Sequence, residues 1–209
     1  MLTLHRAAFV LPDPADPTAP SIADGAVVVR GELVEAVGPY RELAAGRPGA
    51  RVRDWGAALL APGLRNPYGH SLLERAYHPD PREEAGIEPV PDGLAGSTDG
   101  TRCGASARRG LQRMLGYGVT AVAGPFERAS VRTAVARSGV VGLPGAAAGS
   151  GPLDPLAVLP FAEAVYGRVA VGGRADFAVF AVAGDGGAVP VTGGCLATVL
   201  GGRLVYRRR

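Results

Sequence analysis

Apolar and β-branched residues near the start of the chain fall into short runs separated by turn residues, a pattern that predicts strands. The first run covers 2–10 and ends at a loop rich in proline and aspartate. The runs 26–30 and 33–37 are separated only by Gly31-Glu32, so they predict a hairpin. Two further strands are predicted at 51–55 and 58–61.

The end of the chain repeats this pattern. Residues 176–182 form a strongly apolar run, and 197–200 and 203–206 flank Gly201-Gly202 as a second hairpin. Strands of this kind bury one face against a second layer, so we expect strands from both ends to pair into one small β-sandwich. The predicted composite domain is discontinuous and covers 1–61 and 168–209.

The middle of the chain, 62–167, has a different pattern. A helix is predicted over 107–115 with Ser106 as its N-cap, followed by a buried strand at 119–122. A second helix is predicted with Ser130 as its N-cap and Gly139 as its stop, and 140–143 forms the next strand. Asp154-Pro155 signals a further helix start, and Pro160 a fresh turn. Short apolar strands that alternate with helices indicate a βα arrangement.

Composition narrows the function classes. The chain has 209 residues, of which 47% are hydrophobic and 20% charged, values that exclude general disorder. No apolar run is long enough to span a membrane, and the first residues do not resemble a signal peptide, so a cytoplasmic protein is expected. The net charge of +3 comes without a basic stripe, which argues against nucleic-acid binding. Cys103 and Cys195 lie far apart and form no CxxC motif, so no disulfide framework is indicated.

Several segments together carry a resemblance. The order DGAVVVRGELVEAVGP, APGLRNPYGHSLLE, GLQRMLGYGVTAV, GRADFAVFAV and TVLGGRLVY resembles the amidohydrolase superfamily of metal-dependent hydrolases. The imidazolonepropionase-like, cytosine-deaminase-like and aminodeoxyfutalosine-deaminase-like branches are the most similar. The resemblance implies a β-sandwich built from both chain ends around a (β/α)₈ barrel. About a hundred residues separate the two predicted sandwich parts, whereas a closed barrel needs about 250, so we expect a truncated remnant of about three βα units. The predicted fold class is therefore mixed, α+β or α/β.

The expected metal site departs from the family pattern. The resemblance implies a His-x-His pair after the first barrel strand, but this chain has Tyr68-Gly69-His70. Its histidines are His5, His70 and His78, and it has no lysine, so it supplies neither four imidazoles nor a bridging carboxylated lysine. His70, His78 and Asp80 or Cys103 could form an improvised site for a single zinc ion. The alternative is that His70 is a hydrogen-bonded structural residue and that 78–80 is a solvated loop.

Two functions follow. The first is a hydrolase of non-peptide carbon–nitrogen bonds with an eroded metal site, in which His70, His78 and Asp80 hold the metal and the catalytic residues are unknown. The second is a non-catalytic pseudoenzyme that binds a small molecule or acts as an interaction partner. No other cofactor is expected. An open stack of parallel strands exposes backbone edges, so we also predict a homo-oligomer, most simply a dimer.

Overall fold

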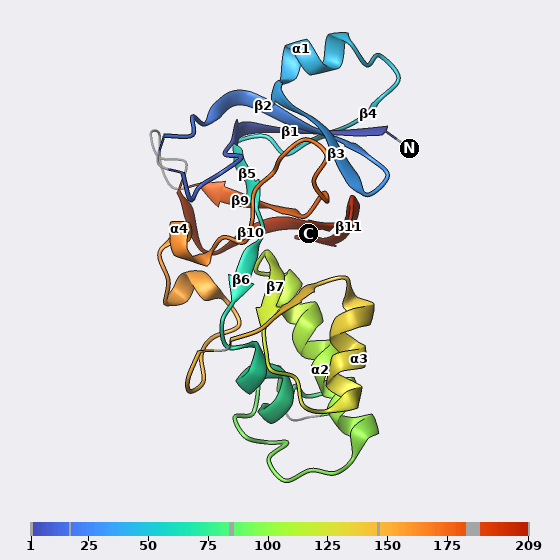
Figure 1. Cartoon of the computed structure of the whole chain (residues 1–209), viewed down its shortest axis with the longest axis vertical. Helices are drawn as coiled ribbons and strands as arrows, with labels where there is room; N and C mark the ends of the chain where they lie inside the picture. The colour runs from blue at the N-terminus through green and yellow to red at the C-terminus, as the bar shows by residue number, and fades with distance from the viewer. Residues whose placement is uncertain (1, 17, 84–85, 146, 183–188, 209) are drawn as a thin grey trace.

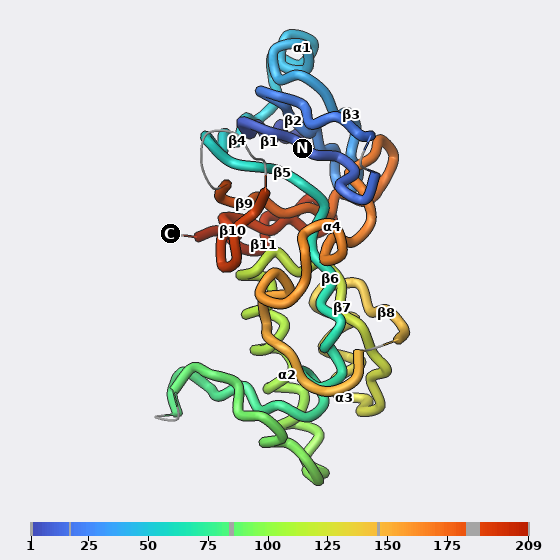
Figure 2. The backbone as a smooth tube through the Cα atoms, turned by 90° about the vertical axis from the view of Figure 1, so that its left-hand side faces the viewer, coloured from blue at the N-terminus to red at the C-terminus, as the bar shows by residue number. Residues whose placement is uncertain are grey.

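A large sheet fills the upper half of an elongated molecule and a small sheet lies directly below it (Figure 1), and a view turned by 90° shows the same arrangement (Figure 2). This computed structural model describes residues 2–16, 18–83, 86–145, 147–182 and 189–208. The chain passes from the large sheet into the small one once and then returns, so strands from both ends of the sequence meet in the large sheet.

The large sheet has eight strands in the order β11-β10-β9-β5-β1-β2-β3, with β4 paired to β1. The antiparallel pair β5–β9 joins the strands from the two ends of the chain, which confirms their predicted pairing. The strands are β1 (Leu2–Val10), β2 (Ile22–Arg30), β3 (Leu33–Pro39), β4 (Arg51–Asp54), β5 (Ala58–Pro62), β9 (Phe177–Val182), β10 (Pro190–Leu200) and β11 (Arg203–Arg207).

Both predicted hairpins are confirmed. Arg30 pairs with Leu33 at the turn of β2–β3, and Leu200 pairs with Arg203 at the turn of β10–β11. The two turns also meet each other, because a Cβ placed on Gly202 would lie 2.2 Å from the carbonyl oxygen of Gly31. Glycine at position 202, where φ is +72°, permits this approach.

The strands of the predicted β-sandwich form one continuous sheet. All eight strands are hydrogen-bonded into one sheet, because β5 pairs with β1 on one edge and with β9 on the other. The sheet curves until its hairpin turns touch, and it encloses a buried apolar cluster. The cluster takes side chains from strands of both halves, among them Val10, Val27, Leu60, Phe177, Val179 and Val199.

The small sheet is parallel and has the order β6-β7-β8, with β6 at Leu64–Asn66, β7 at Val119–Ala123 and β8 at Val141–Leu143. Helix α2 (Gly100–Leu115) lies between β6 and β7 in the sequence, and α3 (Ala129–Ser138) lies between β7 and β8. This alternation confirms the predicted βα pattern. Within the described ranges the parallel strands do not close into a barrel.

Both helices begin before the serines predicted to cap them. Asp99 caps α2, and its side chain accepts a hydrogen bond from the Arg102 N–H at 3.0 Å. Ser106 lies inside α2, buried, where its hydroxyl accepts the His78 N–H at 2.9 Å. Helix α3 begins at Ala129, which places Ser130 in its first turn. The hydroxyl of Ser106 thus takes part in a tertiary hydrogen bond, whereas the sequence predicted that it caps the start of its own helix.

Four short helical segments complete the fold. They are α1 (Tyr40–Ala45), a π-helical turn at Ser71–Arg75, a 3₁₀ turn at Pro155–Ala157 and α4 (Phe161–Ala164). The Asp154 side chain accepts the Leu156 N–H at 2.9 Å, so the predicted start at Asp154-Pro155 is confirmed. No helix in the part of the chain described here has the length and apolarity needed to cross a membrane.

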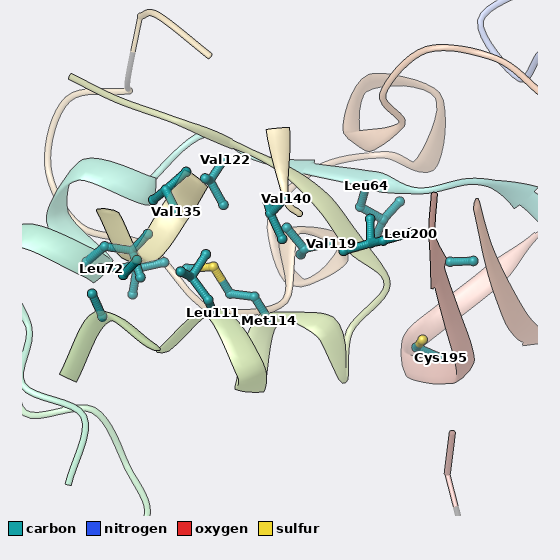
Figure 3. Close-up of a cluster of buried hydrophobic side chains, with 14 of the residues drawn as sticks. Leu64, Leu72, Leu111, Met114, Val119, Val122, Val135, Val140, Cys195 and Leu200 are labelled. Carbon is teal, nitrogen blue, oxygen red and sulfur yellow. The ribbon is translucent and has the colours of Figure 1, made fainter. Parts of the chain in front are cut away.

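A second buried cluster joins the two sheets (Figure 3). Leu111 and Met114 of α2 and Val119 and Val122 of β7 form its centre. Phe180 belongs to β9 of the large sheet but is fully buried in this cluster, with its ring 6.0 Å from that of Phe161. The two sheets therefore share a core.

Candidate functional site

A cavity of about 880 Å³ lies beside the small parallel sheet. The segments that follow all three strands contribute to it: His70 after β6, Pro125 and Glu127 after β7, and 147–151 after β8. The carboxyl ends of parallel strands meet at one edge of a sheet, and this edge is where open α/β sheets bind ligands. The cavity is therefore the candidate functional site.

Other residues of the lining come from segments that are distant from these in the sequence. Arg75 and Asp92 line it and form an ion pair with Nε and Oδ1 2.7 Å apart. Tyr117 lines the cavity just before β7 begins. The pKa of Tyr117 is raised, first by its burial and then by the negative charges of Asp154 and Glu88, which also line the cavity. The lining thus includes residues on both sides of β7 in the sequence, Tyr117 before the strand and Glu127 after it.

His70 is the predicted metal ligand that reaches this cavity. Its Nδ1 lies 2.7 Å from the carbonyl oxygen of Pro125. A carbonyl only accepts hydrogen bonds, so Nδ1 carries the proton and, in the neutral ring, Nε2 keeps its lone pair. Because this contact fixes the imidazole, His70 offers one defined acceptor atom at the edge of the cavity.

His78 lies away from the cavity lining and makes structural hydrogen bonds. It is fully buried, and its Nε2 lies 2.8 Å from the Leu72 carbonyl oxygen, to which it donates. Its carbonyl oxygen accepts the Arg109 Nε–H at 2.7 Å. Helix α2 passes close to the ring, and a Cβ on Gly110 would lie 2.6 Å from Nε2. Burial lowers the pKa of His78 to about 4, so the imidazole stays neutral in the folded protein.

The side chains of Asp80 and Cys103 each contact an arginine. Asp80 forms an ion pair with Arg109 at 3.4 Å. Cys103 is buried, with its Sγ 2.8 Å from Nη1 of Arg128. The same guanidinium neutralises the buried carboxylate of Glu74, whose Oε1 also accepts the Arg128 N–H at 3.0 Å. Arg128 therefore ties α3 to the segments around Glu74 and Cys103.

These placements do not fit a zinc ion. Across the described ranges, no three His, Cys, Asp or Glu side chains come together as a group that could hold a metal. His70 faces the cavity, whereas His78 is enclosed between α2 and the π-helical turn, whose residues include Leu72 and Leu73. The predicted ligands His70, His78 and Asp80 do not come together. His78 is buried against α2 and bonded to Leu72, and Asp80 is paired with the guanidinium of Arg109.

His5 and Asp176 make structural contacts in the large sheet. His5 is buried in β1, with its ring 5.0 Å from that of Phe177. Asp176 precedes β9, and its Oδ1 accepts the Gly201 N–H at 2.7 Å. Both contacts are structural contacts of the large sheet.

Sequence reasoning missed most of the cavity wall. Glu127 follows a predicted strand by a few residues, and that position was the available signal. The segment 147–151 belongs to a stretch rich in glycine and alanine that carries no phosphate-binding motif to mark it as a site. Tyr117 and Glu88 belong to no motif, and only the tertiary fold brings two residues so far apart in the sequence to one cavity.

Comparisons with known proteins give no family. No family model matches the chain, and no curated protein matches it. Among solved structures it is similar to A. niger ochratoxinase (20% identity, TM-score 0.47, 69% of this chain and 30% of that one). It is similar to guanine deaminase from Bradyrhizobium japonicum (19% identity, TM-score 0.49, 74% of this chain and 36% of that one). It is also similar to Helicobacter pylori aminofutalosine deaminase (17% identity, TM-score 0.47, 75% of this chain and 37% of that one). The chain spans about a third of the length of each, and likeness at this level assigns it neither substrate nor catalytic residue.

Proposed function

We propose that this amidohydrolase-like chain binds a small organic molecule in the cavity beside β6, β7 and β8 and holds no zinc centre of its own. The cavity carries the proposal, because all three segments that follow the parallel strands line it. Its volume of about 880 Å³ falls within the range of small-molecule sites. Its lining combines apolar side chains with polar groups that could orient a ligand, as such sites commonly do.

The chemistry of the donor atoms supports the proposal against metal-dependent hydrolysis. A zinc ion needs several deprotonated ligand atoms arranged round one point. His78 would have to leave its buried position and give up the hydrogen bond to Leu72, and Asp80 would have to leave Arg109. The rival proposal, hydrolysis of a carbon–nitrogen bond at a zinc ion held by His70, His78 and Asp80, is favoured only by the available Nε2 of His70.

The predicted homodimer is a further proposal. Strand β8 ends the small sheet, and its outer edge pairs with no other strand among the described residues. Unpaired strand edges favour association, so a second copy of the chain could cover β8.

Binding in the cavity is tested by nuclear magnetic resonance on ¹⁵N-labelled protein. We expect neutral heteroaromatic probes, benzimidazole and 2-aminopyrimidine, to shift backbone amide signals of 70–76, 126–127, 147–151 and 153, which line or adjoin the cavity. Ala147→Trp places a large side chain in the cavity and should abolish these shifts. Ala136→Trp on the exposed face of α3 is the matched control and should preserve them. Shifts that survive Ala147→Trp, or no localised shifts at all, would contradict the proposal.

A further inference from the structure

One wall of the cavity is a single stretch of chain, residues 147–154, all of which line it. Residues 147–150 are exposed and 151–153 are half-buried. Within the described chain, the backbone of 148–153 makes no hydrogen bond to another backbone group. A segment with so few contacts of its own takes its position from whatever attaches it to the rest of the fold. The placement of the 147–154 wall therefore depends on a small number of attachments.

The hydrogen bonds that attach the 147–154 wall lead to the end of strand β6. The Ala147 N–H donates to the carbonyl oxygen of Pro67 at 2.8 Å. The side-chain amide of Asn66 donates to the carbonyl oxygens of Pro152 at 3.0 Å and of Leu153 at 3.1 Å. Two consecutive residues, at positions 66 and 67, thus hold the wall at two separate points along its length.

The Asn66 side chain has partners for both its donors and its acceptor. It is the last residue of β6 and is completely buried. Its Oδ1 accepts the Tyr68 N–H at 2.8 Å. A carbonyl oxygen only accepts hydrogen bonds and a backbone N–H only donates, so these partners fix which way round the amide lies. A side chain of the same shape that lacks the amide could not make these bonds.

The ring of Tyr68 packs against the same wall. A Cβ placed on Gly151 would lie 2.2 Å from Cδ2 of this ring, which is too close for any side chain. Glycine at position 151 therefore lets the backbone of the wall lie directly against the ring. The ring limits how closely the wall can approach β6, and the Asn66 amide prevents it from moving away.

We infer that Asn66 is a positioning residue for ligand binding, whose amide holds the 147–154 wall where that wall can contact a ligand in the cavity. This inference rests on the proposed function, because it concerns how the same cavity is built. Asn66 is not one of the lining residues, so its effect on a ligand passes through Pro152 and Leu153, which are. Loss of the amide would leave their two carbonyl groups without a partner, and the wall would move until they reach water.

The inference is tested by titrating ¹⁵N-labelled protein with benzimidazole and following the nuclear magnetic resonance signals. Asn66→Leu keeps the branched shape of the side chain and removes both donors. We expect it to shift the amide signals of 147–151 and 153 before any probe is added. It should also bind benzimidazole about tenfold more weakly, a loss on the scale of one or two hydrogen bonds.

The matched control is Thr198→Val in the large sheet. Thr198 is also completely buried, and its hydroxyl donates to the carbonyl oxygen of Leu115 at 2.6 Å. Valine keeps the shape and removes this donor, so the control also leaves a backbone carbonyl group without its partner. Because position 198 is outside the cavity lining, the affinity for benzimidazole should stay within about twofold.

A second variant, Gly151→Ala, displaces the wall without changing a buried residue, and it decides the question if Asn66→Leu does not fold. The added methyl group overlaps the Tyr68 ring, so we expect benzimidazole to bind about tenfold more weakly here too. Its control is Gly49→Ala, where the added Cβ meets no atom within 4 Å and the affinity should not change.

Unchanged affinity in either wall variant, or equal weakening in its control, would overturn the inference. The titration of the unsubstituted protein separates this failure from failure of the proposed function. If benzimidazole shifts its cavity amides and binds Asn66→Leu equally well, the inference about Asn66 is wrong and the cavity is still a binding site. If no cavity amide of the unsubstituted protein shifts, the proposed function is wrong, and the inference that rests on it is wrong as well.

Discussion

Replacing Phe180 with alanine is expected to destabilise the protein by about 3–5 kcal/mol, the range for removing a large aromatic side chain from a core. Phe180 is fully buried, and it reaches from β9 of the large sheet into the cluster that contains Met114 of α2 and Val119 of the small sheet. The truncation would leave a void between the two sheets, and the loss of the contact with Phe161 would add to its cost.

Guanidinium chloride unfolding, followed by circular dichroism, measures this effect. Val158→Ala is the control, because Val158 is 51% exposed and its truncation should change the free energy of unfolding by less than about 0.5 kcal/mol. A loss below about 1 kcal/mol for Phe180→Ala would show that the two sheets do not depend on a shared core.

Acidification is expected to cost about 4 kcal/mol of stability between about pH 7 and pH 5, with about half from each of two buried histidines. Burial lowers the pKa of His5 to about 3 and that of His78 to about 4, from the ordinary value of 6.5. Below pH 6.5 the unfolded chain takes up protons that the folded chain excludes, so the free energy of unfolding falls with pH until the folded-state pKa values are reached.

Urea unfolding at several pH values tests this prediction. His5→Phe keeps an aromatic ring beside Phe177 and removes two ring nitrogens that have no hydrogen-bond partner in the described structure. We expect the variant to lose about half as much stability on acidification as the unsubstituted protein, about 2 kcal/mol. An identical pH dependence in both proteins would show that His5 is not buried in its neutral form.

The strands were predictable from sequence because their signals are local. Period-two alternation and the glycines at 31 and 201–202 fix the hairpins whatever the rest of the chain does. The helix starts were less predictable, because Ser106 bonds the backbone of His78 and not its own helix end. That choice depends on how α2 packs, which a linear pattern does not record.

The site could be predicted only in part for the same reason. His70 was found through the resemblance, which implies a His-x-His pair after the first barrel strand, and it does line the cavity. The sequence placed His78 and Asp80 near it because they are close along the chain. The glycine at 110 lets α2 approach His78 and enclose it, and this contact joins residues that no spacing rule connects.

The imidazole rings of His5 and His78 are buried in structural positions, and that of His70 lines a cavity that we propose binds no metal. Zinc content tests this most directly: the purified protein is incubated with zinc, washed and analysed by atomic emission spectrometry, beside His70→Ala. We expect almost no retained zinc in either protein. Close to one zinc ion per chain, lost on the substitution of His70, would contradict it and would establish the metal centre that the donor geometry argues against.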